Sequence, residues 1–106
     1  MRDDTKKYLP LTESTYYIML TLVKPLHGYA VMQRIEEISK GTVKVGPGTL
    51  YGAFISLEKE GLIVKVKEED RRKSYVLTAK GKKVLMNQIK RLKIMTQNGL
   101  SVTDLL

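Results

Sequence analysis

The sequence contains no cysteine, no tryptophan and only one histidine among its 106 residues. Without cysteine it can form neither a disulfide nor a thiolate metal site, which fits an intracellular protein. One imidazole and scattered carboxylates cannot assemble a nucleophile–base pair or a metal cluster. A phosphate-binding P-loop is missing too, since Gly46-Pro47-Gly48 is not followed by Gly-Lys-Ser/Thr. We therefore expect no enzymatic activity, no catalytic residue, no metal and no cofactor.

Long apolar runs are also missing. No stretch approaches the roughly 20 apolar residues that a membrane-spanning helix needs. The first thirty residues lack the basic leader and apolar run of a secretory signal. The 42% of apolar residues are enough for one compact core, although two cores would be hard to build at this length. We expect a soluble, cytoplasmic protein without a membrane partner.

The net charge of +8 is distributed unevenly. Residues 1–70 carry ten basic and ten acidic side chains, whereas residues 71–106 carry nine basic side chains and one acid, Asp104. The whole excess therefore lies in the last third of the chain. A one-sided basic field attracts polyanions such as nucleic acid. A basic surface without a partner is the alternative interpretation of charge alone.

Apolar residues recur at helical spacing in three segments before residue 62. The helices predicted from them are Thr12 to Pro25, Gly28 to Ser39 and Gly46 to Gly61. Thr12 is a suitable N-cap, and Pro25 disfavours helical geometry in the residue before it. Gly41 supplies the break after the second helix, and Pro47 is tolerated in the first turn of the third. Residues 1–10 are polar and are expected to form a loose start.

The third predicted helix has two different faces. Its buried stripe consists of Leu50, Ala53, Phe54 and Leu57. Its opposite face consists of Thr49, Gly52, Ser56 and Lys59. A helix that enters a DNA major groove needs one face on the core and one face with small or polar groups. Gly46 and Gly48 also keep its start slim, so that backbone N–H groups can approach phosphates.

From Leu62 the apolar pattern changes from helical spacing to alternation. Residues 64–67 and 74–77 are rich in β-branched and aromatic side chains and are predicted to be two strands of a hairpin. The polar tip, residues 68–73, combines Glu68, Glu69 and Asp70 with Arg71, Arg72 and Lys73. Arg71 and Arg72 could reach along a DNA backbone or into the minor groove, while the acids could pair with the arginines or repel phosphate. A merely solvated tip is the alternative.

Thr78 is a good N-cap for a last helix that runs to about Gln97. Its apolar stripe follows a domain that is already complete, so it needs a partner, and a second copy of the chain is the simplest candidate. The predicted dimer-interface residues are Leu85, Ile89, Leu92 and Met95, broadened by Val84 and Ile94. We expect residues 1–78 to form a DNA-binding domain and residues 79–106 a dimerisation helix and tail.

The order of these elements predicts a mainly helical α+β fold, a winged helix-turn-helix with a C-terminal dimerisation helix. Three sequence motifs support this, in matching order and spacing. They are His27-Gly28-Tyr29 with the second helix, Gly48-Thr49-Leu50-Tyr51 followed by residues 57–63, and residues 71–81. Together they resemble the PadR family of bacterial transcriptional regulators, in its short subtype with one C-terminal helix. The resemblance covers about residues 12–85.

The resemblance implies repression of a nearby operon and release by a small ligand, so a small apolar or aromatic effector is a further candidate partner. Position by position, Thr49 and Tyr51 match the start of the family's recognition helix, and Arg71, Arg72 and Lys73 match its wing. Gly52 stands where the family often has proline. Multidrug-sensing members bind ligands at a dimer seam, where this chain offers methionine and tyrosine but no tryptophan.

The predicted DNA-binding residues are Gly48, Thr49, Tyr51, Ser56 and Lys59 in the helix, and Arg71, Arg72 and Lys73 in the wing. Tyr51 would offer its hydroxyl to a phosphate, with packing beside Phe54 as the alternative. Ser56 and Lys59 lie later in the helix and would reach only phosphates, or nothing. His27 is expected in a loop or at a helix start rather than as a metal ligand, and Tyr29 is expected to pack against the first helix.

Taken together, these features predict a sequence-specific transcriptional repressor that binds double-stranded DNA as a homodimer. The alternative is a winged-helix module that binds other proteins and not specific DNA. Such modules usually lose the basic wing, which this chain retains at residues 71–73. RNA binding is a weaker option, because exposed stacking aromatics on a sheet are not evident.

Overall fold

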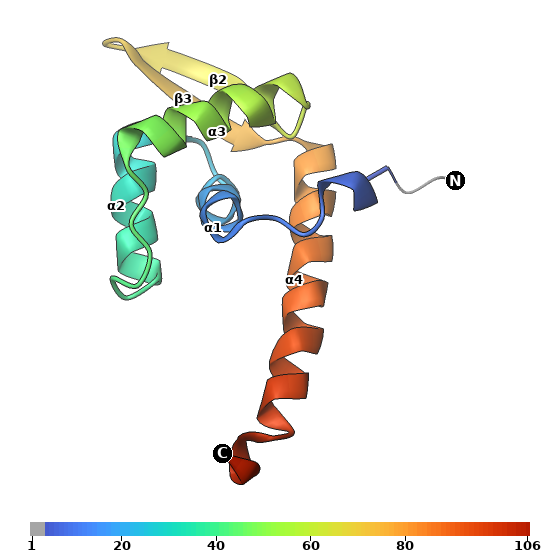
Figure 1. The fold of residues 1–106 in the computed structure, drawn as a ribbon. Helices are drawn as coiled ribbons and strands as arrows, with labels where there is room; N and C mark the ends of the chain where they lie inside the picture. Colours follow the sequence, from blue (N-terminus) through green and yellow to red (C-terminus); the bar gives the residue numbers. More distant parts are fainter. Residues whose placement is uncertain (1–3) are drawn as a thin grey trace.

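The computed structural model describes residues 4–106, apart from the side chain of Lys67. The helices are α1 (Glu13–Thr21), α2 (Gly28–Ile38), α3 (Pro47–Lys59) and α4 (Ala79–Leu100), with short 3-10 turns η1 (Lys6–Tyr8) and η2 (Thr103–Leu105). The strands are β1 (Leu26–His27), β2 (Ile63–Glu69) and β3 (Arg72–Leu77), paired antiparallel in the order β1-β3-β2. In Figure 1 the β2–β3 hairpin lies over α3, and the C-terminal half of α4 projects away from the other elements. The predicted α+β winged helix-turn-helix is confirmed.

Local side-chain chemistry sets the ends of the helices. Thr12 Oγ1 accepts the N–H of Thr15 at 3.2 Å, and Thr78 Oγ1 accepts the N–H of Gly81 at 3.0 Å. His27 caps α2, because its Nδ1 accepts the N–H of Ala30 at 3.4 Å. Thr12 and Thr78 are the N-caps that the sequence predicts, and His27 lies at a helix start, one of the two places expected for it.

The ends of α1 and α2 differ in how well they were predicted. Gly41, at φ +75°, ends α2 by donating its N–H to the Glu36 carbonyl at 2.8 Å, the break that the sequence predicts. The predicted end of the first helix near Pro25 is wrong by a few residues. The helix stops at Thr21, and Val23 is exposed instead of buried, because the chain turns there into β1.

The hairpin has longer strands and a shorter tip than predicted. Instead of strands over 64–67 and 74–77, pairing extends to Glu69 opposite Arg72. The turn consists of Asp70 and Arg71 alone, with φ values of 49° and 66°. Positive φ at both central residues gives a tight turn whose twist matches that of the strands. Strand β1 was not predicted, since two residues are too few to show an alternating pattern.

The hydrophobic core joins all four helices to the sheet. Its members include Ile18 of α1, Ile35 of α2, Leu50 of α3, and both Val84 and Leu85 of α4. The expectation that the domain is complete before the last helix is therefore wrong. The first turns of α4 complete the core, because Val84 and Leu85 are buried there together with apolar residues of the other helices and the sheet.

The segment before α1 is fastened to α4. Asn87 Nδ2 donates to Thr5 Oγ1 at 2.7 Å, and the N–H of Leu11 donates to the buried Gln88 Oε1 at 3.1 Å. The prediction of a loose start is thus wrong for the described residues 4–10, while residues 1–3 lie outside them. The hydrogen-bond partners of this segment are side chains of α4, far away in the sequence, so the polar composition of the segment could not predict its ordered structure.

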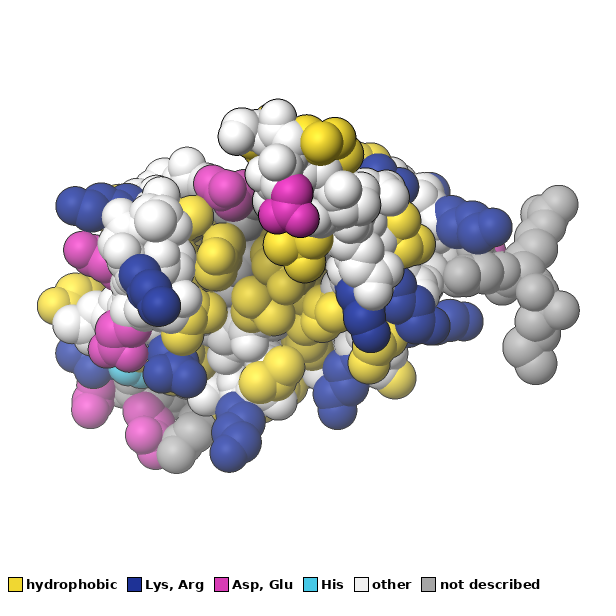
Figure 2. Space-filling view, turned by 90° about the horizontal axis from the view of Figure 1, so that it is seen from below, with side chains coloured by type: hydrophobic (Ala, Val, Ile, Leu, Met, Phe, Trp, Pro, Cys, Tyr) yellow, Lys and Arg dark blue, Asp and Glu magenta, His cyan; other side chains and the backbone are white. Residues whose placement is uncertain are grey.

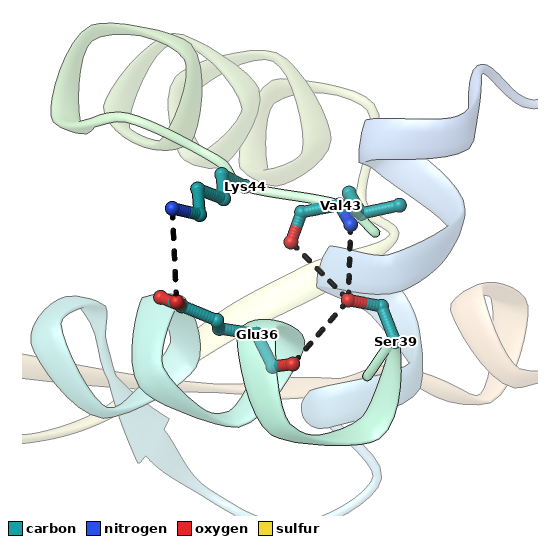
Figure 3. Close-up of polar contacts among 4 residues, drawn as sticks. All are labelled: Glu36, Ser39, Val43 and Lys44. Carbon is teal, nitrogen blue, oxygen red and sulfur yellow. Dashed lines mark hydrogen bonds and ion pairs between the residues drawn. The ribbon is translucent and has the colours of Figure 1, made fainter. Parts of the chain in front are cut away.

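The loop between α2 and α3 is fixed by one buried serine (Figure 3). Ser39 Oγ accepts the N–H of Val43 at 3.1 Å and lies 3.2 Å from the Val43 carbonyl and 3.4 Å from that of Glu36, either of which can take its proton. At the surface Lys44 Nζ lies 3.9 Å from Glu36 Oε1. With Val43 and Val45 buried, these contacts hold α3 in a set position relative to α2.

Candidate nucleic-acid interface

The outer face of α3 is exposed along its length. Gly48, Thr49, Gly52, Ser56 and Lys59 are all exposed, as their predicted role in DNA binding requires. This face separates two hollows. On one side, Thr49, Gly52 and Ser56 line a groove of about 600 Å³ that also includes residues of the N-terminal segment and of α1.

The second hollow lies between the helix-turn-helix and the wing. It has a volume of about 450 Å³ and is named here the wing cavity. Its lining comes from the start of α2 (His27, Gly28, Tyr29), from α3 (Tyr51, Phe54, Ile55) and from the hairpin (Arg71, Arg72, Lys73, Tyr75). No acidic residue is among these described lining residues. The cavity thus combines aromatic walls with three positive charges.

Two lining residues were missed or misplaced by the sequence analysis. Ile55 is 69% exposed, and its spacing of four residues after Tyr51 was the available signal for this face. Tyr29 does not pack against the first helix as expected. It is 60% exposed, and its hydroxyl accepts a hydrogen bond from Gln33 Nε2 at 3.3 Å, because the first turn of α2 faces the wing.

Tyr51 combines the two roles that the sequence left open. Its ring meets Phe54 edge-on at 6.1 Å between centroids, yet the residue is 52% exposed. Phe54 in turn packs against Tyr75 at 4.7 Å, and burial raises the pKa of Tyr75, with a smaller contribution from Glu58. These inner rings form an apolar floor that leaves the Tyr51 hydroxyl at the rim, beside the α2 backbone at Gly28.

The acidic side chains of the hairpin tip lie in different surroundings. Glu68 Oε2 pairs with Lys65 Nζ at 3.4 Å, whereas Glu69 and Asp70 line a separate hollow with His27, Arg72 and Ser74. Glu69 also lies opposite Arg72 in the β2–β3 register. Glu69 and Asp70 therefore lie beside Arg72 and His27, which also line the wing cavity, although none of the three acids of the tip is among the described lining residues of the cavity itself.

The predicted dimer residues of α4 fall into two groups. Leu85 is buried in the core of its own chain and cannot meet a partner's surface without unpacking it. Ile89 and Met95 are exposed, by 38% and 60%, and Leu92 is half-buried. Met86 and Ile94 are exposed as well.

Lys80 differs from the other basic residues of α4. Its Nζ donates to the Glu60 carbonyl at 3.0 Å and lies 5.1 Å from the centroid of the Tyr8 ring. The hydrogen-bonding contact with Tyr8 raises the pKa of Lys80. This lysine therefore ties α4 to the end of α3 and to η1, instead of extending the basic surface of the wing.

Over the part of the chain that the structure describes, no cluster of histidine or carboxylate side chains could hold a metal ion. None of the helices in residues 4–106 has both the length and the apolar character needed to cross a bilayer. An exposed helix beside a basic wing, on a winged-helix core, defines the class of winged-helix DNA-binding regulators.

The comparison with known families agrees with this class. Residues 18–87 match the family described as "Transcriptional regulator PadR-like family". The match spans well over half of the chain, and the protein therefore belongs to the PadR-like family of transcriptional regulators. Members of this family are regulators of transcription and not enzymes.

Known relatives are similar to parts or all of the chain. A transcriptional regulator from Clostridium thermocellum shares the fold at 23% identity, with a TM-score of 0.71 and coverage of 96% of this chain and 99% of that chain. A PadR-like transcription factor from Bacteroides fragilis is 26% identical, with a TM-score of 0.71 and coverage of 95% and 100%. Transcriptional regulator YqjI of Escherichia coli is 33% identical over 55 residues, which are 52% of this chain and 27% of YqjI. The chain spans 27% or less of the length of the curated relatives it matches.

Proposed function

We propose that this regulator is a sequence-specific DNA-binding repressor that acts as a homodimer on an inverted-repeat operator. The observation that carries the proposal is the exposed outer face of α3 beside the wing cavity. The described lining residues of that cavity include three basic side chains and no acidic one. A duplex laid against this surface would meet polar side chains in its groove and positive charge along its backbone.

In the proposed complex, α3 enters the major groove with its N-terminal end foremost. Gly48, Thr49 and Tyr51 lie within the first five residues of α3 and would approach base edges and phosphates. Ser56 and Lys59 lie one to two turns later, where the backbone of the duplex diverges, so they would contact phosphates. The basic side chains of the wing, Arg71, Arg72 and Lys73, would follow the adjacent DNA backbone and supply salt-dependent affinity.

The homodimer is proposed from the exposed apolar surface of α4. Ile89, Met95 and Leu100 are exposed on a helix half that extends beyond the core (Figure 1). Figure 2, seen from below Figure 1 and so opposite the wing, shows hydrophobic side chains gathered in the middle of this face. A second copy would bury this surface and place two α3 helices about one helical turn of DNA apart, roughly 34 Å. Residues 1–78 would then contact DNA, while residues 79–106 would join the copies.

Repression and its release follow from this placement. A dimer bound across an operator blocks access to that DNA, and an effector that alters the seam between the copies would change the spacing of the two α3 helices. The exposed Met86 and Met95 give this seam adaptable apolar side chains, suited to a small apolar or aromatic ligand. Thermal-shift measurements with aromatic cations test this part of the proposal. A complete lack of stabilisation would count against it.

The experiment that tests the function is fluorescence anisotropy with labelled DNA from upstream of the protein's own gene. Binding is measured at several salt concentrations, with and without unrelated competitor DNA. Saturable binding that survives competitor at physiological salt supports a sequence-specific regulator. Equal loss of binding to both DNAs as salt rises would contradict it, and would favour a winged helix whose partner is another protein.

A further inference from the structure

The wing cavity has a more specific role that rests on the proposed DNA binding. We propose that it seats one phosphate of the DNA backbone in each half-site, and that Gly28 positions the Tyr51 hydroxyl at this seat. In this proposal Tyr51 contacts the phosphate directly, whereas Gly28 is a positioning residue that affects DNA binding only by setting the place of the Tyr51 hydroxyl.

The geometry at Gly28 carries the positioning argument. A Cβ added to this residue would lie 3.0 Å from Tyr51 Oη and 3.3 Å from Tyr51 Cε1, with Leu50 Cδ2 at 3.2 Å. An alanine there would therefore require the Tyr51 phenol and the Leu50 side chain to shift by a few tenths of an ångström. Because Tyr51 is half exposed, its ring could swing outward to relieve such a contact, at the cost of moving its hydroxyl.

The cavity offers hydrogen-bond donors and positive charge from three directions. The Tyr29 hydroxyl accepts from Gln33, which leaves its own proton for an acceptor in the cavity. The start of α2 faces the same space, and the positive end of a helix favours an anion. Arg72 and Lys73 close the cavity from the wing. A phosphate diester held here would complete charge-assisted hydrogen bonds that the free protein lacks.

The position of the cavity favours a DNA phosphate over a free anion. It lies between α3 and the wing, the two elements that bracket a DNA strand in the proposed complex. A strand that passes from the groove occupied by α3 to the wing must cross this opening. The surface that recognises the phosphate is therefore continuous with the surface that recognises the bases.

The test combines protein variants with a modified operator. Wild type, Tyr51→Phe, Gly28→Ala and the double variant are titrated with the operator duplex, and then with duplexes in which one phosphate at a time is a neutral methylphosphonate. Tyr51→Phe and Gly28→Ala should each weaken binding about tenfold, the size expected for one hydrogen bond to a charged group. The double variant should bind no more weakly than Tyr51→Phe. At one position in each half-site, a methylphosphonate should weaken DNA binding by wild type about tenfold. The same duplex should bind Tyr51→Phe almost as well as the unmodified operator does.

Controls separate this inference from folding and from the proposed function. Thermal unfolding of Gly28→Ala should stay close to that of wild type, since alanine suits a helix and the contacts with Tyr51 and Leu50 need a shift of only a few tenths of an ångström. Tyr17→Phe removes a phenol hydroxyl outside the cavity and should bind as wild type does. The phosphate seat would be overturned if the losses of affinity in the double variant were additive. It would also be overturned if every methylphosphonate weakened wild type and Tyr51→Phe equally. In both cases DNA binding itself would remain established. A third outcome would also overturn the DNA-phosphate seat. Inorganic phosphate would stabilise wild type but not Tyr51→Phe, while no methylphosphonate in the operator had an effect that depends on Tyr51. The cavity would then bind a free anion. A wild-type protein that prefers no operator would instead refute the proposed function itself.

Discussion

Replacing Gly81 by alanine should destabilise the protein markedly, although alanine normally favours a helix. Gly81 lies in the first turn of α4, where the helix touches the chain that leads into the wing. An alanine Cβ would lie 2.0 Å from the Leu62 carbonyl oxygen and 3.0 Å from its carbonyl carbon. Real Cβ contacts below 3.0 Å essentially do not occur, so helix and strand would have to separate by about 1 Å.

The magnitude follows from what that separation breaks. The Leu62 carbonyl accepts the N–H of Thr78, the cap of α4, at 3.0 Å. Over-packing in a core costs about 1–3 kcal/mol, and a weakened backbone hydrogen bond adds about 1 kcal/mol. The better helix propensity of alanine offsets up to about 1 kcal/mol. The net loss in the free energy of unfolding is about 2 kcal/mol, which corresponds to a fall in Tm of about 8–16 °C for a domain of this size.

The assay is thermal unfolding followed by circular dichroism at a fixed protomer concentration, since self-association makes Tm concentration-dependent. Gly99→Ala is the matched control, because Gly99 belongs to the same helix and a Cβ there meets nothing within 4 Å. It should leave Tm unchanged or raise it. A Gly81→Ala variant as stable as wild type would refute the close approach between α4 and Leu62, and so would an equal loss in Gly99→Ala.

Three further outcomes are expected. Leu92→Asp should convert a solution dimer to monomer in analytical ultracentrifugation with its helical circular dichroism kept, and an undiminished dimer would refute the proposed seam. Ser39→Ala should lower the free energy of unfolding by about 1–3 kcal/mol in urea titrations, because it leaves the buried Val43 N–H without its acceptor; an unchanged midpoint would contradict this. Arg72→Ala should weaken binding to operator and unrelated DNA alike and reduce the salt slope by about 1, whereas a loss confined to operator DNA would mean that Arg72 reads bases.

Features that depend on neighbouring residues could be predicted from the sequence. Thr12, Thr78 and Gly41 act within one helical turn of themselves, so their residue types were sufficient to locate helix ends. The outer face of α3 followed from its 3.6-residue period, which sorts side chains regardless of what covers them. The family motifs added the order of helices and wing.

Features that depend on contacts between distant segments could not be predicted. Whether Leu85 faces its own core or a partner is decided by where α4 crosses the sheet, since both surfaces accept the same apolar stripe. Strand β1 exists because His27 lies opposite Ser74 in the register, not because of a local pattern.

The candidate site shows the same division. The sequence determined that a hairpin with a charged tip follows a helix with a slim start and one polar face, because those properties belong to short segments. Only the tertiary structure decided that Gly28 lies against Tyr51, that Tyr29 faces the wing, and that Glu69 and Asp70 share a second hollow with Arg72 instead of lining the wing cavity. The physical reason is that a charge or a hydroxyl acts over a few ångströms, and folding, not sequence spacing, sets which groups come within that range.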